Sequence, residues 1–412
     1  MKLRLEEFKR TEEKPAMELF YDGIKADQTR DYYTRRLRYL LCGVFEEIFS
    51  GSLEERAKEL VERSRSEPKF TVDLMLNFLA LCRQRTSLPK THPDYLSPYS
   101  VPGYLKPVKK LLDMNDAVIS WKRIYAAIPE FEGRKSGRGY TREEIQTLLR
   151  VTANPADHAV ILIAASSGIR SGAFEFRWGD VVPVYMENSK LTLEKSEKTE
   201  LVCTAILIYK GSEQEYLAFI TPEAHHALME HRKRWMQQVG REPLPNDPVF
   251  KKLGRIAEQQ STIFIRERLN RLVRRSGVRP QEKKRRHEIP TMNGFRKFWN
   301  KTVKETESKD VIGSLIKKEY LMGHDGLVSL DKNYFQSSIL ELAEEYLTVV
   351  SRLTITDEFQ LKAENMKLKM ERDEVLELAK DAVDERNKAI EALRRNLRRN
   401  EFSAKLPTEI RA

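Results

Sequence analysis

The chain has 412 residues, which is long enough for two or three domains. Hydrophobic residues make up 40% of it and charged residues 33%, a composition too apolar for a disordered protein. Lysine and arginine number 73 against 62 aspartate and glutamate, and the net charge of +11 favours a polyanionic partner without identifying one. Three cysteines, Cys42, Cys82 and Cys203, form no close pair, which excludes a disulfide framework and a zinc motif and fits a reducing compartment.

Membrane and export signals are not expected. The longest apolar run, HAVILIAASSGI, is too short to span a bilayer. The first residues, MKLRLEEFKRTEEK, lack the apolar core of a signal peptide. We therefore expect a cytoplasmic protein with no membrane partner.

The N-terminal part is predicted to be helical. After an extension over residues 1–28, apolar residues recur at helical spacing through residues 29–130, as in YYTRRLRYLLCGVFEEIF. Basic side chains on these helices are candidates for phosphate contacts, and solvated helix faces are the alternative interpretation. The candidates are Lys106, Lys109, Lys110, Lys122 and Arg123.

A basic, glycine-rich stretch over residues 131–139 is typical of an exposed linker. It adds Arg134, Lys135 and Arg138 to the candidates for phosphate contact. Thr141 and Glu144 then form a capping box at the start of TREEIQTLLRV. A second domain is therefore predicted over residues 140–355.

The second domain mixes helices with a few strands. An apolar helix through HAVILIAAS ends at Gly168, and a further helical run carries Arg170. Two β-rich runs flank Lys210 in LVCTAILIYKGSEQEYLAFIT, which indicates a hairpin. Helices return over residues 222–236 and over residues 261–277, where Gly277 is a predicted C-cap. The predicted fold class is mainly α with a small antiparallel β-sheet.

Residues 356–400 are predicted to form one long helix, followed by a tail over residues 401–412. Apolar residues recur there every seven positions, which suggests a surface for a partner helix. Because the companion positions are often charged, a single solvent-exposed helix is equally consistent. The repeating positions are Leu361, Leu368, Val375, Ala382 and Ala389.

Five polar residues of the second domain form a candidate catalytic set. Arg170 and Arg296 are permanently cationic and suit the charge that grows on a phosphodiester under attack. Tyr334 is a candidate nucleophile that would store the bond energy as a phosphotyrosine, without nucleotide or metal. Lys210 at a hairpin tip is a candidate proton donor, and His324 a hydrogen-bond donor or proton carrier.

These residues resemble the tyrosine recombinase family, also called phage integrases. The stretch SSGIRSGAFEFRWGDV is similar to the first arginine box of that family, with Arg170 at its catalytic arginine. The hairpin lysine corresponds to Lys210, the H-x-x-R box falls on residues 293–296, and the L-G-H box falls on residues 322–324. The nucleophile falls on Tyr334. YTREEIQTLL and SSILELAEEYLTVVSRLTI resemble archaeal members.

The resemblance implies a site-specific DNA recombinase or integrase of a mobile element. Residues 29–130 would be the core-binding domain and residues 140–355 the catalytic domain, closing around double-stranded DNA as a clamp. Tyr334 would form a covalent 3′-phosphotyrosine, and two synapsed duplexes would imply a homotetramer at the nucleoid. No cofactor or metal is implied.

The chain departs from the family pattern at two positions. Asn293 replaces the histidine of the H-x-x-R box and becomes a candidate site residue as a hydrogen-bonding amide. Ala173 stands where a glutamate is usual. A catalytically weakened or inactive DNA-binding protein of the same fold is therefore an alternative, as is a type IB topoisomerase.

Four histidines outside the predicted set are not expected to be catalytic or metal-binding. His287 lies in the basic run KKRRH, which is better suited to phosphate contact. His225, His226 and His231 lie on one helix without metal-ligand spacing and are expected to face solvent or to pack.

Overall fold

A computed structural model describes residues 14–130, 137–280, 287–306, 317–323 and 338–404 of the chain. The chain forms two compact units, Met1–Lys135 (unit 1) and Ser136–Ala412 (unit 2). The boundary lies within the 131–139 segment that the sequence predicts to be a linker. His324 and Tyr334 lie outside the described residues, as do Arg134 and Lys135.

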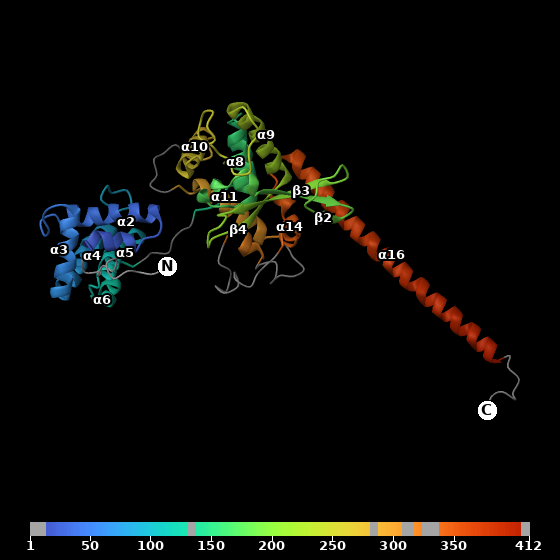
Figure 1. Ribbon diagram of the computed structural model, residues 1–412, viewed down its shortest axis with the longest axis horizontal. Coiled ribbons are helices and arrows are strands. Elements are labelled where there is room, and N and C mark those ends of the chain that lie inside the picture. The colour runs from blue at the N-terminus through green and yellow to red at the C-terminus, as the bar shows by residue number, and fades with distance from the viewer. Residues whose placement is uncertain (1–13, 131–136, 281–286, 307–316, 324–337, 405–412) are drawn as a thin grey trace, which may run out of the picture. The chain divides into compact units, whose positions relative to one another are not determined.

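Helices, joined by turns and irregular segments, are the regular elements of unit 1 in its described residues (Figure 1). Local signals set several of its boundaries, because Ser52 and Glu55 form a capping box at the start of α3 and Pro68 occupies the first turn of α4. The elements of unit 1 are α1 (Ala16–Asp22), α2 (Asp27–Tyr39), the π-helical turn η3 (Leu40–Val44), α3 (Leu53–Ser66), α4 (Pro68–Thr86), the 3-10 turn η4 (Pro98–Ser100), α5 (Pro102–Met114) and α6 (Trp121–Ala126).

The core of unit 1 includes residues that the sequence analysis assigned to an extension. Met17 and Phe20 of α1 are buried, and they join the same apolar cluster as Leu37 of α2. Asn115 donates a hydrogen bond of 3.1 Å to the carbonyl of Ala16, which ties α1 to the end of α5. The segment 1–28 thus contains a core helix of unit 1.

Unit 2 contains one four-stranded antiparallel sheet in the order β2-β1-β3-β4. Two of its strands, β1 (Val181–Glu187) and β2 (Lys190–Thr192), precede the region where the sequence predicts strands. Pro183 weakens the strand signal of β1, and it lies where β1 pairs with β3 alone, because β2 pairs only with Tyr185–Glu187. The predicted hairpin around Lys210 is formed by β3 (Glu200–Ile208) and β4 (Tyr216–Ile220).

Helices surround the sheet of unit 2, and α8 is the most deeply buried of them. Nearly every residue of α8 is buried, and the helix contacts α7, α9, α11 and β4. Its last carbonyls anchor other elements, since Trp299 and the fully buried Tyr346 both donate to the carbonyl of Ser166, at 2.9 and 2.8 Å. The helices of unit 2 are α7 (Arg142–Arg150), α8 (Pro155–Ser167), the 3-10 turns η5 (Ser171–Glu175) and η6 (Trp178–Asp180), α9 (Pro222–Val239), α10 (Thr262–Arg275), α11 (Thr291–Lys304), α14 (Ile339–Leu347), α15 (Val350–Leu353) and α16 (Asp357–Ala404).

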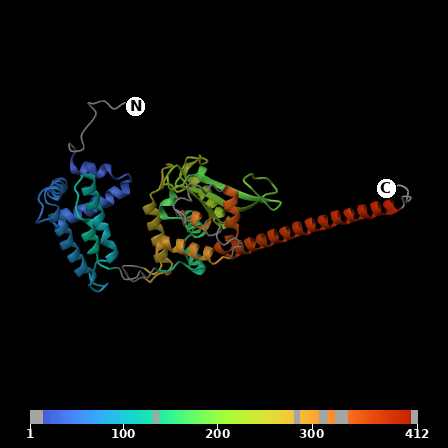
Figure 2. The ribbon, with the colours of Figure 1, turned by 90° about the horizontal axis from the view of Figure 1, so that it is seen from below.

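The long helix α16 has a packed first part and an exposed second part. Met366 and Met370 pack against the core of unit 2, and Ser189 donates to the Asp373 carboxylate at 3.1 Å. Beyond that contact the helix extends away from the other elements of unit 2 in both views (Figures 1 and 2). In the described part of the chain, no helix has the length and apolarity needed to cross a membrane.

The predicted fold class, mainly α with a small antiparallel sheet and a long C-terminal helix, is confirmed. The capping box of Thr141 and Glu144 is also present, with hydrogen bonds of 2.8 and 3.3 Å. The prediction that Arg170 lies on a helix is wrong. Arg170 is extended and precedes the short 3-10 turn η5.

Candidate functional site

The guanidinium of Arg296 joins two chain segments that are distant in sequence. Arg296 lies on α11 and donates to the carbonyl of Gly168 at 2.9 Å and to that of Met322 at 2.7 Å. Burial, and then the like charge of Arg170, lower the pKa of Arg296. Because its side chain is half-buried, Arg296 depends on these carbonyl dipoles to compensate for lost hydration.

Arg170, two residues after Gly168 in the sequence, contacts the same segment. The helix α8 ends at Gly168, which takes a left-handed conformation with φ of 61°. The chain then becomes extended at Arg170, whose guanidinium donates to the carbonyl of Gly323 at 3.1 Å and remains exposed. Two arginines from α11 and the end of α8 therefore converge on the consecutive residues Met322 and Gly323.

Gly323 is fixed in place by a tyrosine ring from the hairpin. Its φ is +63°, and a Cβ at this position would lie 2.6 Å from a ring carbon of Tyr216. Its N–H donates to the carbonyl of Tyr320 at 2.8 Å. Only glycine combines this backbone conformation with such close contact. The predicted His324 follows directly in the sequence.

Tyr209 and Tyr216, which were not among the predicted site residues, lie at opposite ends of the β3–β4 loop. Their rings are 6.3 Å apart, and the charges of Arg170 and Arg296 act on both hydroxyls. Burial nevertheless dominates: it raises the pKa of Tyr209 and raises that of Tyr216 to about 12. The pattern of two tyrosines flanking the predicted tip at Lys210 is the signal that could have identified them.

Lys210 lies on the β3–β4 loop, as predicted, and is held by a buried carboxylate. Its Nζ is 3.1 Å from Oδ1 of Asp180, whose side chain is 6% exposed, whereas that of Lys210 is 62% exposed. The other oxygen of Asp180 accepts the N–H of Arg177 at 2.8 Å. Asp180 therefore orients a cation that remains accessible, close to the end of β3.

Asn293 lies one helical turn before Arg296 on α11, and its side chain is exposed. This places an amide at the position where the resembling family has histidine. Ala173 lies within η5 and is buried in the core of unit 2. His287 is partly buried near the start of α11.

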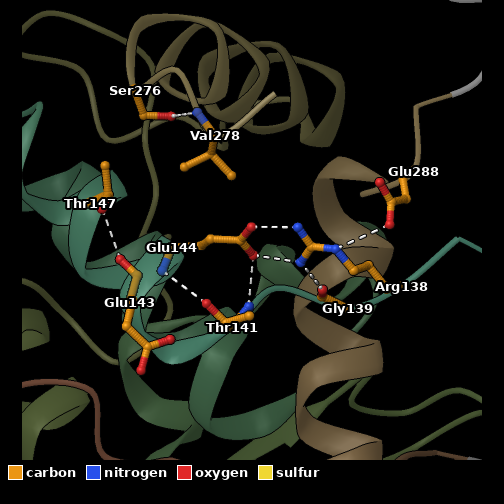
Figure 3. A network of polar contacts seen from close by, with 9 residues as sticks. All are labelled: Arg138, Gly139, Thr141, Glu143, Glu144, Thr147, Ser276, Val278 and Glu288. Carbon is orange, nitrogen blue, oxygen red and sulfur yellow. Dashed lines mark hydrogen bonds and ion pairs between the residues drawn. The ribbon is translucent and has the colours of Figure 1, made fainter. Parts of the chain in front are cut away.

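Arg138, a candidate for phosphate contact, is bound within unit 2 (Figure 3). Its guanidinium donates to both carboxylate oxygens of Glu144, at 2.8 and 2.6 Å, and lies 3.3 Å from a Glu288 oxygen. Glu144 also closes the capping box with Thr141. This network connects the segment before α7 with the segment before α11.

The candidate basic residues of unit 1 differ in accessibility. Lys106, Lys122 and Arg123 are exposed. Lys109 is partly buried, with its ammonium 3.3 Å from Asp113 and 5.3 Å from the Trp121 ring centre. Lys110 is partly buried as well. The exposed three are free to meet a phosphate without first leaving such a packed position.

His231 on α9 serves packing. His231 is buried, its Nε2 lies 2.9 Å from the carbonyl of Val249, and its ring stacks on Phe250. Burial lowers the pKa of His231 to about 4 and that of His225 to about 4. Among the described residues, no group of three or more histidine, cysteine, aspartate or glutamate side chains could hold a metal ion.

Comparison with known proteins gives distant structural similarity alone. No family model and no curated protein matches the chain. Among solved structures, it is similar to the XerA recombinase, with 14% identity over 82% of this chain and 98% of that one and a TM-score of 0.32. It is also similar to the XerH site-specific recombinase bound to palindromic difH substrate, with 15% identity over 86% of this chain and 98% of that one and a TM-score of 0.41. A third similar structure is the Tn1549 transposon integrase in complex with transposon right end DNA, with 10% identity over 80% of this chain and 98% of that one and a TM-score of 0.45.

These solved structures are recombinases and an integrase. At TM-scores below 0.5 the similarity carries no argument about the activity or partners of this chain. A functional assignment therefore depends on the residues of the site.

Substitution of Gly323 tests whether the Tyr216 contact holds this segment. Gly240→Ala is a matched control, because Gly240 has a φ of +84° and open space where a Cβ would lie. We expect Gly240→Ala to cost about 1 kcal/mol through its backbone conformation. Gly323→Ala should lower the free energy of unfolding by about 1–3 kcal/mol more, because the new methyl group overlaps the ring. Urea titration measures both, and equal losses would contradict the contact.

The buried His231 predicts a defined pH dependence of stability. Its folded-state pKa of about 4 lies below the ordinary value of 6.5, so between these limits the unfolded state binds the extra proton. The free energy of unfolding should therefore fall as the pH drops from about 6.5 to about 4, by about 1.4 kcal/mol per pH unit for this residue. His231→Gln should reduce that slope in urea titrations.

His226→Gln is the control, because His226 is on the same helix and exposed. It should leave the slope unchanged. The same slope in His231→Gln as in the parent chain would show that His231 is not the responsible group.

Proposed function

We propose that this chain is a site-specific DNA recombinase or integrase that cleaves and rejoins DNA through a covalent 3′-phosphotyrosine at Tyr334. The observation that carries the proposal is the convergence of Arg170 and Arg296 on Met322 and Gly323. It brings two fixed cations to the segment that leads into His324 and Tyr334. Such a pair is what a pentacoordinate phosphorane requires, because that transition state carries more negative charge than the phosphodiester.

Arg170 is placed to bind a phosphate. Its guanidinium is exposed and carries five N–H groups, and the printed contact with the carbonyl of Gly323 engages NH1 alone. The like charges of the pair oppose each other, and an anion between them relieves that repulsion. Substrate binding and transition-state stabilisation therefore come from the same residues.

The remaining candidate residues take supporting roles in this proposal. Tyr334 attacks the phosphorus, its proton leaves to a neighbouring base or water, and the bond to the 5′ oxygen breaks. Lys210, which Asp180 orients, gives a proton to that leaving oxygen. His324 and the exposed amide of Asn293 hydrogen-bond the non-bridging oxygens. Religation reverses these steps, so no nucleotide is consumed.

The substrate would be double-stranded DNA, held largely through its phosphates. The exposed Lys106, Lys122 and Arg123 of unit 1 are the described candidates for those contacts. We infer a homotetramer on two synapsed duplexes, and DNA as the substrate would place the protein at the nucleoid in the cytoplasm. The resemblance of two segments to archaeal recombinases supports an archaeal host.

A second function, DNA binding without strand cleavage, is favoured by one specific observation. Asn293 exposes an amide where the resembling family has a histidine, and an amide cannot take up or release a proton at neutral pH. Salt-dependent DNA binding without any covalent adduct would support this second function over the first. Relaxation of supercoiled plasmid by a monomer, without recombinant products, would instead indicate a type IB topoisomerase.

The identity of the nucleophile can be tested with a suicide DNA substrate, which traps the covalent intermediate. The parent chain should form an adduct that survives denaturing electrophoresis, and Tyr334→Phe should form none, because the attacking oxygen is missing. Tyr125→Phe, at an exposed tyrosine of unit 1, is the control and should trap as much DNA as the parent chain. An undiminished adduct in Tyr334→Phe would exclude Tyr334 as the nucleophile.

Conservative substitution of the two arginines tests their role in the transition state. Arg170→Lys and Arg296→Lys should each slow single-turnover cleavage by about 10²–10³-fold, because lysine cannot donate two parallel hydrogen bonds. Arg241→Lys is the matched control, since Arg241 is an exposed arginine paired with Asp247. Cleavage as fast as that of Arg241→Lys would remove both arginines from the mechanism.

A further inference from the structure

The second part of α16 exposes large apolar side chains that no described part of the chain covers. Val375 is 64% exposed, Leu376 50%, Val383 54% and Leu393 63%. These values contrast with Met366 and Met370, which pack on the core of unit 2. In both views this part of the helix lies beyond the other elements of unit 2 (Figures 1 and 2). An uncovered apolar surface of this kind favours a partner.

Apart from Leu378, these exposed apolar residues lie on one face with a seven-residue repeat. Leu376, Val383 and Ile390 repeat at the first core position of a heptad, and Ala379, Arg386 and Leu393 occupy the second. The repeat of Val375, Ala382 and Ala389, which the sequence analysis identified, lies directly beside the first position. This repeat borders the core positions of the heptad and is not itself a core position, which explains why the positions that would accompany it in a core are often charged.

Charge divides this part of α16 into two opposite halves. Residues 373–385 contain six acidic residues and one lysine, whereas residues 386–399 contain six basic residues and one glutamate. A parallel pair of such helices would place like charges side by side along its whole length. An antiparallel pair places each acidic half along a basic half.

We propose that residues 373–395 of α16 pair with the same residues of a second copy of this chain as an antiparallel coiled coil. The charge pattern sets the direction, and the apolar repeat sets the register. In this register the core layers pair Leu376 with Leu393, Ala379 with Ile390, and Val383 with Arg386 of the second copy. Each layer joins a first core position to a second, as antiparallel heptads require.

The flanking positions fit the same register. On one side, Ala382 meets Ala389 of the second copy, and these small side chains let the helices approach closely. On the other side, Arg394 meets Asp373 of the second copy, and Lys380 meets Asn387. Arg386 at a core layer covers apolar surface with its stem and carries its charge outward, toward Asp384 of the second copy. A single polar core residue of this kind fixes register.

The mass of the full chain without DNA gives the first test. Sedimentation equilibrium at micromolar concentrations should show a concentration-dependent dimer for the parent chain. Leu393→Lys should shift it to monomer. Leu378→Lys is the matched control, because Leu378 is also 63% exposed but lies off the seam, and it should remain a dimer. A parent chain that stays monomeric, or a Leu393→Lys chain that dimerises like the control, overturns the proposal.

The direction of pairing is tested by cysteine cross-linking of two variants, Ala379→Cys and Ile390→Cys. In the antiparallel register these positions share a layer, so oxidation of a mixture should give a mixed disulfide, while each variant alone should stay uncross-linked. A parallel pair predicts the reverse, with each variant cross-linking to itself. The parent chain, with Cys42, Cys82 and Cys203, controls for background. Self-cross-linking in each variant alone, or no cross-linking in the mixture, contradicts the register.

DNA is absent from both measurements, so neither depends on catalysis by Tyr334.

Discussion

The site depends on the hydrogen bonds from two guanidiniums to three backbone carbonyls, those of Gly168, Met322 and Gly323. The left-handed turn at Gly168 ends α8 and lets the chain deliver Arg170, and a Cβ there would lie 2.9 Å from Trp299. The carbonyl of Gly168 also accepts a hydrogen bond from Arg296 of α11. One helix end thus positions both cations, and the surrounding core of α8, α11 and α14 keeps that end rigid.

This arrangement shapes the electrostatics of the site. Carbonyl dipoles hold Arg296 in a half-buried position, while burial and the nearby charge of Arg170 lower its pKa. The cost of bringing two cations together is met when the protein folds, so the site is organised before any anion arrives. Tyr209 and Tyr216 lie on the hairpin side of this site, and burial raises the pKa of each hydroxyl.

Sequence patterns predicted the parts of this molecule that local chemistry determines. The capping box at Thr141 and the hairpin around Lys210 follow from short-range signals, and both are present. Strand β1 is not predicted because Pro183 weakens its local signal, and its pairing with β3 is a property of the sheet. The carbonyl partners of Arg170 and Arg296 and the ring of Tyr216 against Gly323 are tertiary contacts, which no local pattern encodes.

The central claim is that Arg170 and Arg296 bind one phosphate for attack by Tyr334. Its most direct test is a structure of the full chain with a duplex that stalls at the cleavage step. The account predicts that both guanidiniums lie within about 3 Å of the non-bridging oxygens of one phosphate, with the Tyr334 oxygen in line with the leaving 5′ oxygen. A phosphate held elsewhere, or a different tyrosine in line with it, would contradict the account.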